Sequence, residues 1–115
     1  MPEILLVDDH EPTTRLIRLT LSLEGFNVRT CQTGDEALVA AREQMRDLLI
    51  SDYLMPGLDV VSFVEQLRSD GFRGSVLLCT AFDGPINVPR STLLKKPFDP
   101  NQLTSTVMQL LALTD

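Results

Sequence analysis

Three stretches of almost unbroken aliphatic residues constrain the fold more than any other feature of the chain. They are residues 4–7 (ILLV), 48–50 (LLI) and 76–78 (VLL). A strand with one solvated face alternates apolar and polar residues, whereas a strand covered on both faces is apolar throughout, as in parallel sheets. Segments with the apolar spacing of amphipathic helices separate these stretches. The alternation predicts an α/β fold in which helices cover both faces of a doubly wound parallel sheet, giving three layers.

The expected elements alternate along the whole chain. Strands are expected at residues 3–8, 27–31, 48–52, 75–80 and 92–95. Helices are expected to begin at Pro12, at a capping box formed by Thr33 and Glu36, at Asp59 and at Asp99. The apolar stripe of the second helix is expected to extend to Met45.

The segment 81–92 interrupts this rhythm, because a helix is expected between the fourth and fifth strands but the residues oppose one. Gly84-Pro85 and Val88-Pro89 lie within it, and proline both removes a helical hydrogen bond and disfavours helix at the preceding residue. The segment is also close to the minimum length of a parallel crossover, about 10–12 residues. We therefore expect this helix to be absent or reduced to one turn, and the loop to be the most mobile part of the domain.

Chemically distinct polar groups stand where four of the strands end. Asp8 and Asp9 follow the first strand, Asp52 the third, Thr80 the fourth and Lys96 the fifth. The carboxyl ends of strands in an open α/β sheet meet at one crevice, so the fold would gather these groups into a single site. Clustered carboxylates hold Mg²⁺ through oxygen. A hydroxyl and an ammonium can bind phosphoryl oxygens, and a carboxylate can act as a nucleophile.

Composition limits the class of protein. The 115 residues match the common size of one domain. A formal net charge of −6 argues against direct binding to nucleic acid. No apolar run approaches the roughly 18 residues of a membrane span, and the segment 1–3 lacks the basic region of a signal peptide. We expect one cytoplasmic domain that binds neither nucleic acid nor a membrane.

Four motifs resemble those of response-regulator receiver domains of two-component signalling, the CheY-like family. They are ILLVDD at 4–9, SDYLMPGLD at 51–59, LLCTA at 77–81 and KKPF at 95–98. The resemblance runs from residue 3 to about residue 113 and implies one receiver domain over residues 1–115. It also implies a five-stranded sheet in the flavodoxin-like order 2-1-3-4-5.

Cys31 and Cys79 are not expected to form a disulfide. They lie on the expected second and fourth strands, three positions apart in that order and so roughly 14 Å apart at about 4.8 Å per strand. A disulfide needs Cα atoms within about 7 Å. We expect two reduced thiols, which is the usual state in the cytoplasm.

The resemblance implies a Mg²⁺ site among the acids. Asp9 is expected to ligate the ion directly and Asp8 directly or through water, with Asp52 and the backbone carbonyl of Leu54 completing the protein ligands. Considered without the resemblance, Asp8 and Asp9 could instead cap the first helix. Two adjacent acids are costly without a cation, however.

The resemblance further implies that Asp52 accepts a phosphoryl group from a sensor histidine kinase or phosphotransfer protein. Thr80 and Lys96 are expected to bind that group, the small Ala81 to keep access open, and the bond from Lys96 to Pro97 to be cis. Phosphorylation would change the conformation and so signal to an effector domain or a downstream protein. The domain is expected to be a signalling phosphoprotein rather than an enzyme.

Other interpretations stay open. Asp52, Thr80 and Lys96 could be a loop acid, an ordinary β-branched strand residue and a surface lysine. The same fold could serve as a phosphorylation-independent interaction module. A phosphatase of the haloacid-dehalogenase type would carry its nucleophile on the first strand and a second acid two residues later, where this chain has His10. A lone histidine is also a poor metal site.

Three positions depart from the usual pattern of the family. Val60 stands where a glycine usually follows the acid, Leu93 stands where an aromatic residue usually precedes the lysine by three positions, and the segment 81–92 is short. The last two belong to the face that usually changes shape after phosphorylation. We therefore expect the phosphorylation chemistry to be intact and the readout to be altered. Phe82 could supply a substitute moving ring, or could simply pack a loop that lacks a helix.

Overall fold

The computed structural model describes residues 1–44 and 46–112, and these residues form a five-stranded sheet with helices on both sides. The strands pair in the order β2-β1-β3-β4-β5, and every pairing is parallel. The predicted fold class and strand order are therefore confirmed. In chain order the elements are β1 (Glu3–Val7), α1 (Glu11–Leu23), β2 (Asn27–Cys31), α2 (Gly34–Glu43), β3 (Leu48–Ser51), α3 (Val60–Ser69), β4 (Ser75–Thr80), β5 (Ser91–Lys95) and α4 (Pro100–Ala112).

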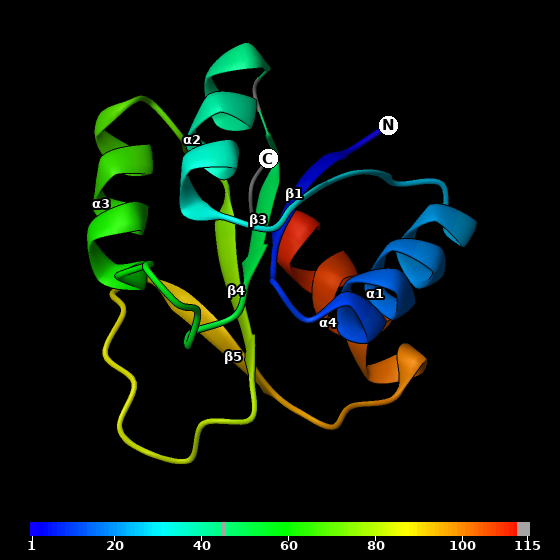
Figure 1. Ribbon diagram of the computed structural model, residues 1–115. Coiled ribbons are helices and arrows are strands. Elements are labelled where there is room, and N and C mark those ends of the chain that lie inside the picture. The colour runs from blue at the N-terminus through cyan, green and yellow to red at the C-terminus, as the bar shows by residue number, and fades with distance from the viewer. Residues whose placement is uncertain (45, 113–115) are drawn as a thin grey trace.

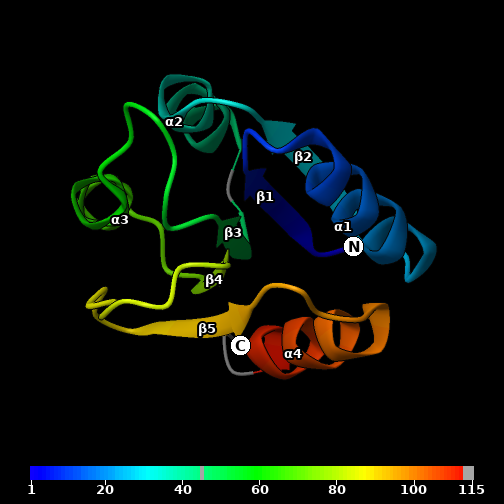
Figure 2. The same ribbon diagram turned by 60° about the horizontal axis from the view of Figure 1, so that its bottom comes forward.

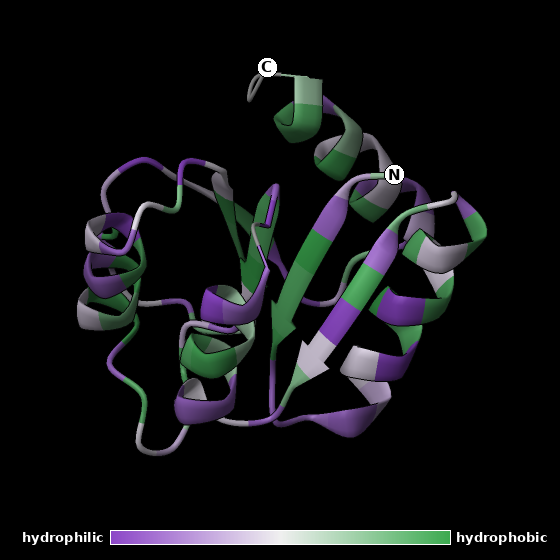
Figure 3. Ribbon diagram, turned by 90° about the horizontal axis from the view of Figure 1, so that it is seen from above, coloured by the Kyte–Doolittle hydropathy of each residue, from purple (hydrophilic) through white to green (hydrophobic). Residues whose placement is uncertain are grey.

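The sheet separates two apolar cores. Helices α2 and α3 cover one face, and α1 and α4 cover the other (Figure 1, Figure 2). Strand β1 shows how one aliphatic run serves both cores, because Leu5 and Val7 face α2 and α3 while Ile4 and Leu6 face α1 and α4. The hydropathy colouring accordingly is mostly green along the inner strands, while the edge strand β2 and helices α1, α2 and α3 carry purple as well as green (Figure 3).

Side chains at the start of three helices fix where those helices begin. Thr33 accepts a hydrogen bond from the Glu36 backbone N–H, and Asp59 accepts from the N–H groups of Val61 and Ser62. In α4, Asp99 and Gln102 each accept a backbone N–H from the other, which is a reciprocal capping box. The expected caps Thr33, Asp59 and Asp99 are thus confirmed, although the Glu36 side chain accepts the backbone N–H of Gln32 instead of closing the expected box with Thr33.

The ends of some predicted elements differ slightly from those observed. Helix α1 begins at Glu11, one residue before the proline that predicted it, and β5 begins at Ser91. Met45, expected to extend the stripe of the second helix, lies outside the described residues, and α2 ends at Glu43. Among the described helices, none combines the length and hydropathy needed to cross a bilayer.

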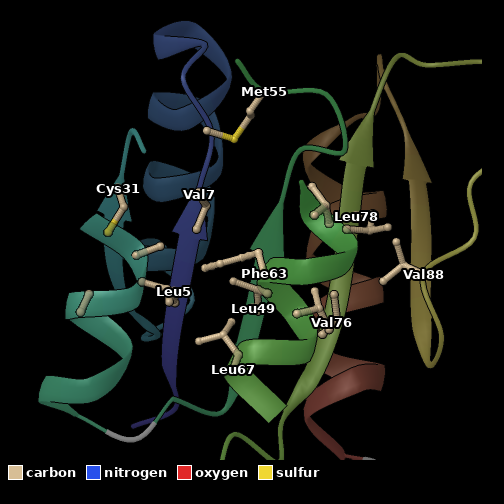
Figure 4. Close-up of a cluster of buried hydrophobic side chains, with 14 residues drawn as sticks. Leu5, Val7, Cys31, Leu49, Met55, Phe63, Leu67, Val76, Leu78 and Val88 are labelled. Carbon is tan, nitrogen blue, oxygen red and sulfur yellow. The ribbon is translucent and has the colours of Figure 1, made fainter. Parts of the chain in front are cut away.

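No helix connects β4 to β5, as the prolines predicted, since none of residues 81–90 is helical. The connection is nevertheless anchored, because Val88 is buried in the same core as Phe63 and Leu78 (Figure 4), and Ile86 packs against that core. Burying a valine contributes about 1.5 kcal/mol or more. Leu93, on the same face of the sheet as Leu78, remains 46% exposed, because no helix covers β5 there.

Candidate functional site

The ammonium of Lys96 joins two carboxylates that come from different strands. Its Nζ lies 3.0 Å from Asp8 Oδ2 and 2.9 Å from Asp52 Oδ2. Asp8 follows β1, Asp52 follows β3 and Lys96 follows β5, so the carboxyl edge of the sheet gathers them as predicted. All three are shielded from water, since the exposed fraction of the side chain is 1% for Asp8, 13% for Asp52 and 16% for Lys96.

The remaining carboxylate oxygens are held by backbone amides. Asp8 Oδ1 accepts the N–H of His10 at 2.9 Å, and Asp52 Oδ1 accepts the N–H of Leu54 at 3.1 Å. Both carboxylates are therefore fixed in orientation, with one oxygen on the backbone and the other on Lys96. Two negative charges share one positive charge, so the cluster keeps an excess negative charge that favours a further cation.

The charge state of Lys96 reflects this arrangement. Burial by itself lowers the pKa of the ammonium, but the hydrogen bonds and charges of Asp52 and Asp8 outweigh burial and raise the pKa above its ordinary value. Lys96 is therefore firmly protonated at neutral pH. It can serve as a cationic donor to oxygen atoms, and not as a base.

Asp9 does not join the cluster. Its side chain is exposed, and within residues 1–44 and 46–112 no three side chains of the Asp, Glu, His and Cys types gather in a way that could hold a metal ion. Two converging carboxylates are nonetheless the hard oxygen donors that Mg²⁺ prefers, and their excess negative charge suits a divalent ion. The residues present thus fit Mg²⁺, with Asp8 and Asp52 already converging and Asp9 exposed next to Asp8 in the chain.

Thr80 ends β4 and is 1% exposed, but its hydroxyl serves the following loop. Thr80 Oγ1 accepts the N–H of Phe82 at 3.2 Å, while the Thr80 carbonyl accepts the N–H of Lys96 at 2.9 Å. Thr80 thus pairs with Lys95 in the sheet, accepts the Lys96 amide through its carbonyl, and is hydrogen-bonded to the loop through its side chain. A change in the direction of this hydroxyl would remove the partner of the Phe82 amide.

Phe82 is held from three sides. Its amide donates to Thr80, its carbonyl accepts from Lys95 Nζ, and its ring stacks on the ring of Tyr53 with centroids 5.4 Å apart and planes inclined by 27°. Lys95 also contacts Asp83 at 2.8 Å. Tyr53 directly follows Asp52, so this stack connects the loop after β3 with the loop after β4.

An open hollow of about 540 Å³ leads to Asp52 and Lys96. Ala81 lies on its rim and is exposed, so a small side chain stands at the entrance. The bond from Lys96 to Pro97 is cis, as expected. His10 is exposed at the same rim, where its Nδ1 lies 2.7 Å from Thr13 Oγ1. The full lining consists of His10, Thr13, Leu16, Asp52, Ala81, Lys96, Pro97 and Phe98.

Tyr53 is a part of the site that was not predicted from the sequence. A signal was present, because an aromatic residue directly follows the acid of one strand end and another lies two residues after Thr80. Neighbouring strand ends place such residues side by side. The direction of the Thr80 hydroxyl, in contrast, could not be predicted from the sequence.

The chain belongs to the response regulator receiver domain family, whose family model matches residues 4–108. It is similar to the alkaline phosphatase synthesis transcriptional regulatory protein PhoP of Bacillus subtilis, with 30% identity over 115 residues that cover 95% of this chain and 48% of that protein. The chain spans about half the length, or less, of the curated relatives that it matches. Receiver domains of this family are signalling modules of two-component systems.

Solved structures agree with this assignment. Chemotaxis protein CheY4 of Vibrio cholerae superposes with a TM-score of 0.88 at 30% identity, covering 96% of this chain and 98% of that chain. Response regulator TrrA of Thermotoga maritima, solved in complex with Mg²⁺ and BeF, gives 0.84 at 27% identity, covering 96% and 99%.

Proposed function

We propose that this chain accepts a phosphoryl group on the carboxylate of Asp52. The observation that carries the proposal is the shared contact of Lys96 with Asp52 and Asp8, at 2.9 and 3.0 Å. The Asp52 carboxylate is shielded from water and is oriented by a backbone amide. The neighbouring ammonium of Lys96 can donate to the oxygens of an incoming phosphoryl group. A loop acid or a solvated lysine would have neither feature.

The donor is a histidine kinase or a phosphotransfer protein that presents phosphohistidine. An Asp52 oxygen forms the new P–O bond with its lone pair, while the P–N bond breaks and its electron pair returns to the imidazole ring. Such transfer depends on alignment and charge neutralisation more than on bond-making by the protein. The fixed carboxylate orientation, with Oδ1 on the Leu54 amide, supports that requirement.

Mg²⁺ would be held by Asp8, Asp9, Asp52 and the Leu54 carbonyl. When bound, the ion would neutralise the charge that builds up between the carboxylates and the phosphoryl oxygens. The excess negative charge of the cluster supports this assignment, as does the Mg²⁺ present in the similar TrrA structure. Asp9, whose side chain is exposed, is the ligand that would have to turn inward.

Two residues would bind the phosphoryl group, and a third would keep access to it open. Lys96 would donate a charge-assisted hydrogen bond to one of its oxygens. Thr80 would turn its hydroxyl away from the Phe82 amide and donate to another phosphoryl oxygen. Ala81 would leave room for the donor, since a larger side chain at this exposed position would fill the entrance.

Signalling would follow from the movement of Thr80. Once the hydroxyl turns, the Phe82 amide loses its partner, and Phe82 keeps only two of the three contacts that hold it. The loop 81–90 would then rearrange. A transition between ordered and disordered states of a segment is a known switching mode. This readout suits a chain that has Leu93 in place of an aromatic residue and no helix between β4 and β5.

The proposal extends to the context of the domain. We assign residues 1–115 to one receiver domain that acts in the cytoplasm, where Cys31 and Cys79 stay reduced, as their free and buried thiols allow. An effector domain or a separate downstream protein would receive the signal. We propose no enzymatic activity for the domain.

Phosphorylation by acetyl phosphate with Mg²⁺ tests the proposal. Intact-mass measurement should show one added phosphoryl group in the wild type and none in Asp52→Asn. Asp35→Asn makes the same chemical change at an exposed position of α2 and should label normally. Labelling of Asp52→Asn would reject the site. A wild type that neither labels nor responds to Mg²⁺ would favour the phosphorylation-independent interaction module.

A further inference from the structure

Three arginines from different segments line one hollow at the amino ends of β4 and β5. Arg68 lies in the last turn of α3, Arg73 lies in the loop before β4, and Arg90 directly precedes β5. The hollow has a volume of about 370 Å³, and Gly71 and Phe72 complete its lining. It lies at the opposite end of the strands from Asp52, which follows the carboxyl end of β3.

These arginines have no carboxylate partners among residues 1–44 and 46–112. The ion pairs of that part of the chain engage Arg15, Arg42, Arg46, Lys95 and Lys96 instead. The neighbouring acid Asp70 pairs with Arg42 at 3.3 Å. Glu65 lines the adjoining hollow but makes no ion pair with Arg68 or Arg90. A local excess of positive charge is unexpected in a chain of net charge −6.

Arg68 is fixed in place by the loop that follows its helix. Its Nη1 donates to the carbonyls of Phe72 at 3.3 Å and Gly74 at 2.6 Å, and its guanidinium lies 5.1 Å from the centre of the Phe72 ring. Burial lowers the pKa of Arg68, and repulsion from Arg90, which lines the same hollow, lowers it further. The guanidinium is therefore preorganised, and its other nitrogens stay available to a ligand.

The backbone of Arg90 gives an independent indication. Its φ is 56°, in the left-handed region that a residue with a Cβ adopts at a cost and that favours glycine. Three glycines of this chain do occupy positive-φ positions, at residues 25, 57 and 71. A strained residue at a position that a glycine would occupy without strain points to a use for its side chain.

We propose that the hollow lined by Arg68, Arg73 and Arg90 binds a small phosphorylated anion. One guanidinium group can donate two parallel hydrogen bonds to phosphate oxygens. Three guanidinium groups match a ligand with two or more negative charges. The volume suits a compact ligand. The site is separate from Asp52, which follows the opposite end of the strands.

Titration with inorganic pyrophosphate in Mg²⁺-free buffer, followed by amide NMR shifts at constant ionic strength, tests the proposal. The wild type should show saturable shifts at residues 68–74 and 90. Arg90→Gly should weaken binding at least about tenfold, the loss of one charge-assisted contact, while its thermal midpoint stays unchanged or rises. Arg73→Gln should weaken binding likewise, because this exposed side chain can be changed without altering the backbone.

The exposed Arg18 of α1 provides the matched control, since Arg18→Gln removes the same charge elsewhere and should leave binding unchanged. The proposal is overturned if the shifts fail to saturate, or if they centre on Lys96. Equal weakening in Arg18→Gln and Arg90→Gly would also overturn it, because binding would then follow net charge only.

Discussion

Replacing Lys96 with methionine removes the only cation that contacts Asp8 and Asp52 among the described residues. The two oxygens lie within 3.0 Å of the same nitrogen, so they are no more than about 6 Å apart. At that separation two unit charges repel by about 3 kcal/mol at an effective dielectric constant of about 20. Loss of one partner from a buried ion pair has a similar cost. We therefore expect Lys96→Met to fold but to lose about 3 kcal/mol of unfolding free energy.

Urea denaturation followed by circular dichroism, first in EDTA and then with Mg²⁺, measures this effect. Mg²⁺ should restore more stability to Lys96→Met than to the wild type, because the ion would replace the missing positive charge between the carboxylates. Lys95→Met is the matched control. Its partner Asp83 is fully solvated, so the change in stability should be small and independent of Mg²⁺.

Two results would refute this reasoning. In the first, Lys96→Met is as stable as Lys95→Met in EDTA, and the carboxylates therefore do not repel each other as calculated. In the second, adding Asp8→Asn to Lys96→Met restores no stability. Removing one of the two like charges should restore most of the loss, so its failure would place the cause elsewhere.

Two further properties follow from the structure. Burial raises the pKa of Cys79 from 9.0 to about 12, so between these values the folded state keeps a proton that the unfolded chain releases. The resulting stability is complete below pH 9 and is lost as pH rises toward 12, by up to about 4 kcal/mol. Cys79→Ala should flatten this part of the dependence of unfolding free energy on pH, measured by urea denaturation. Tyr53 is the only tyrosine in a chain without tryptophan, so its fluorescence reports the stack with Phe82. Beryllofluoride with Mg²⁺ should change that fluorescence in the wild type and not in Phe82→Ala; an unchanged signal in the wild type would exclude the stack from signalling.

Much of the fold could be predicted because its determinants are local. The aliphatic runs specify strands covered on both faces, and Asp59 and Asp99 specify helix starts through their own side chains. Pro85 and Pro89 exclude a helix between β4 and β5 without reference to the rest of the molecule. The convergence of Asp8, Asp52 and Lys96 required only the strand order and the direction of the strands.

The features that could not be predicted depend on side-chain directions and on contacts distant in the sequence. Asp9 follows Asp8 but points to the surface, because successive side chains of an extended segment diverge. The Thr80 hydroxyl turns to the Phe82 amide, a choice between neighbours that residue type does not decide. The arginine hollow depends on the left-handed turn at Arg90, and the sequence gives no sign of this turn because the residue is not a glycine.

The most direct test of the central proposal is to locate the acyl phosphate itself. The wild type would be phosphorylated with acetyl phosphate and Mg²⁺, reduced with borohydride, which converts a phosphorylated aspartate to homoserine, and digested for peptide mass spectrometry. The account predicts homoserine at position 52 and at no other aspartate. Homoserine at position 8 or 9, or complete absence of conversion in a protein shown by intact mass to carry a phosphoryl group, would contradict the assignment of Asp52 as the acceptor.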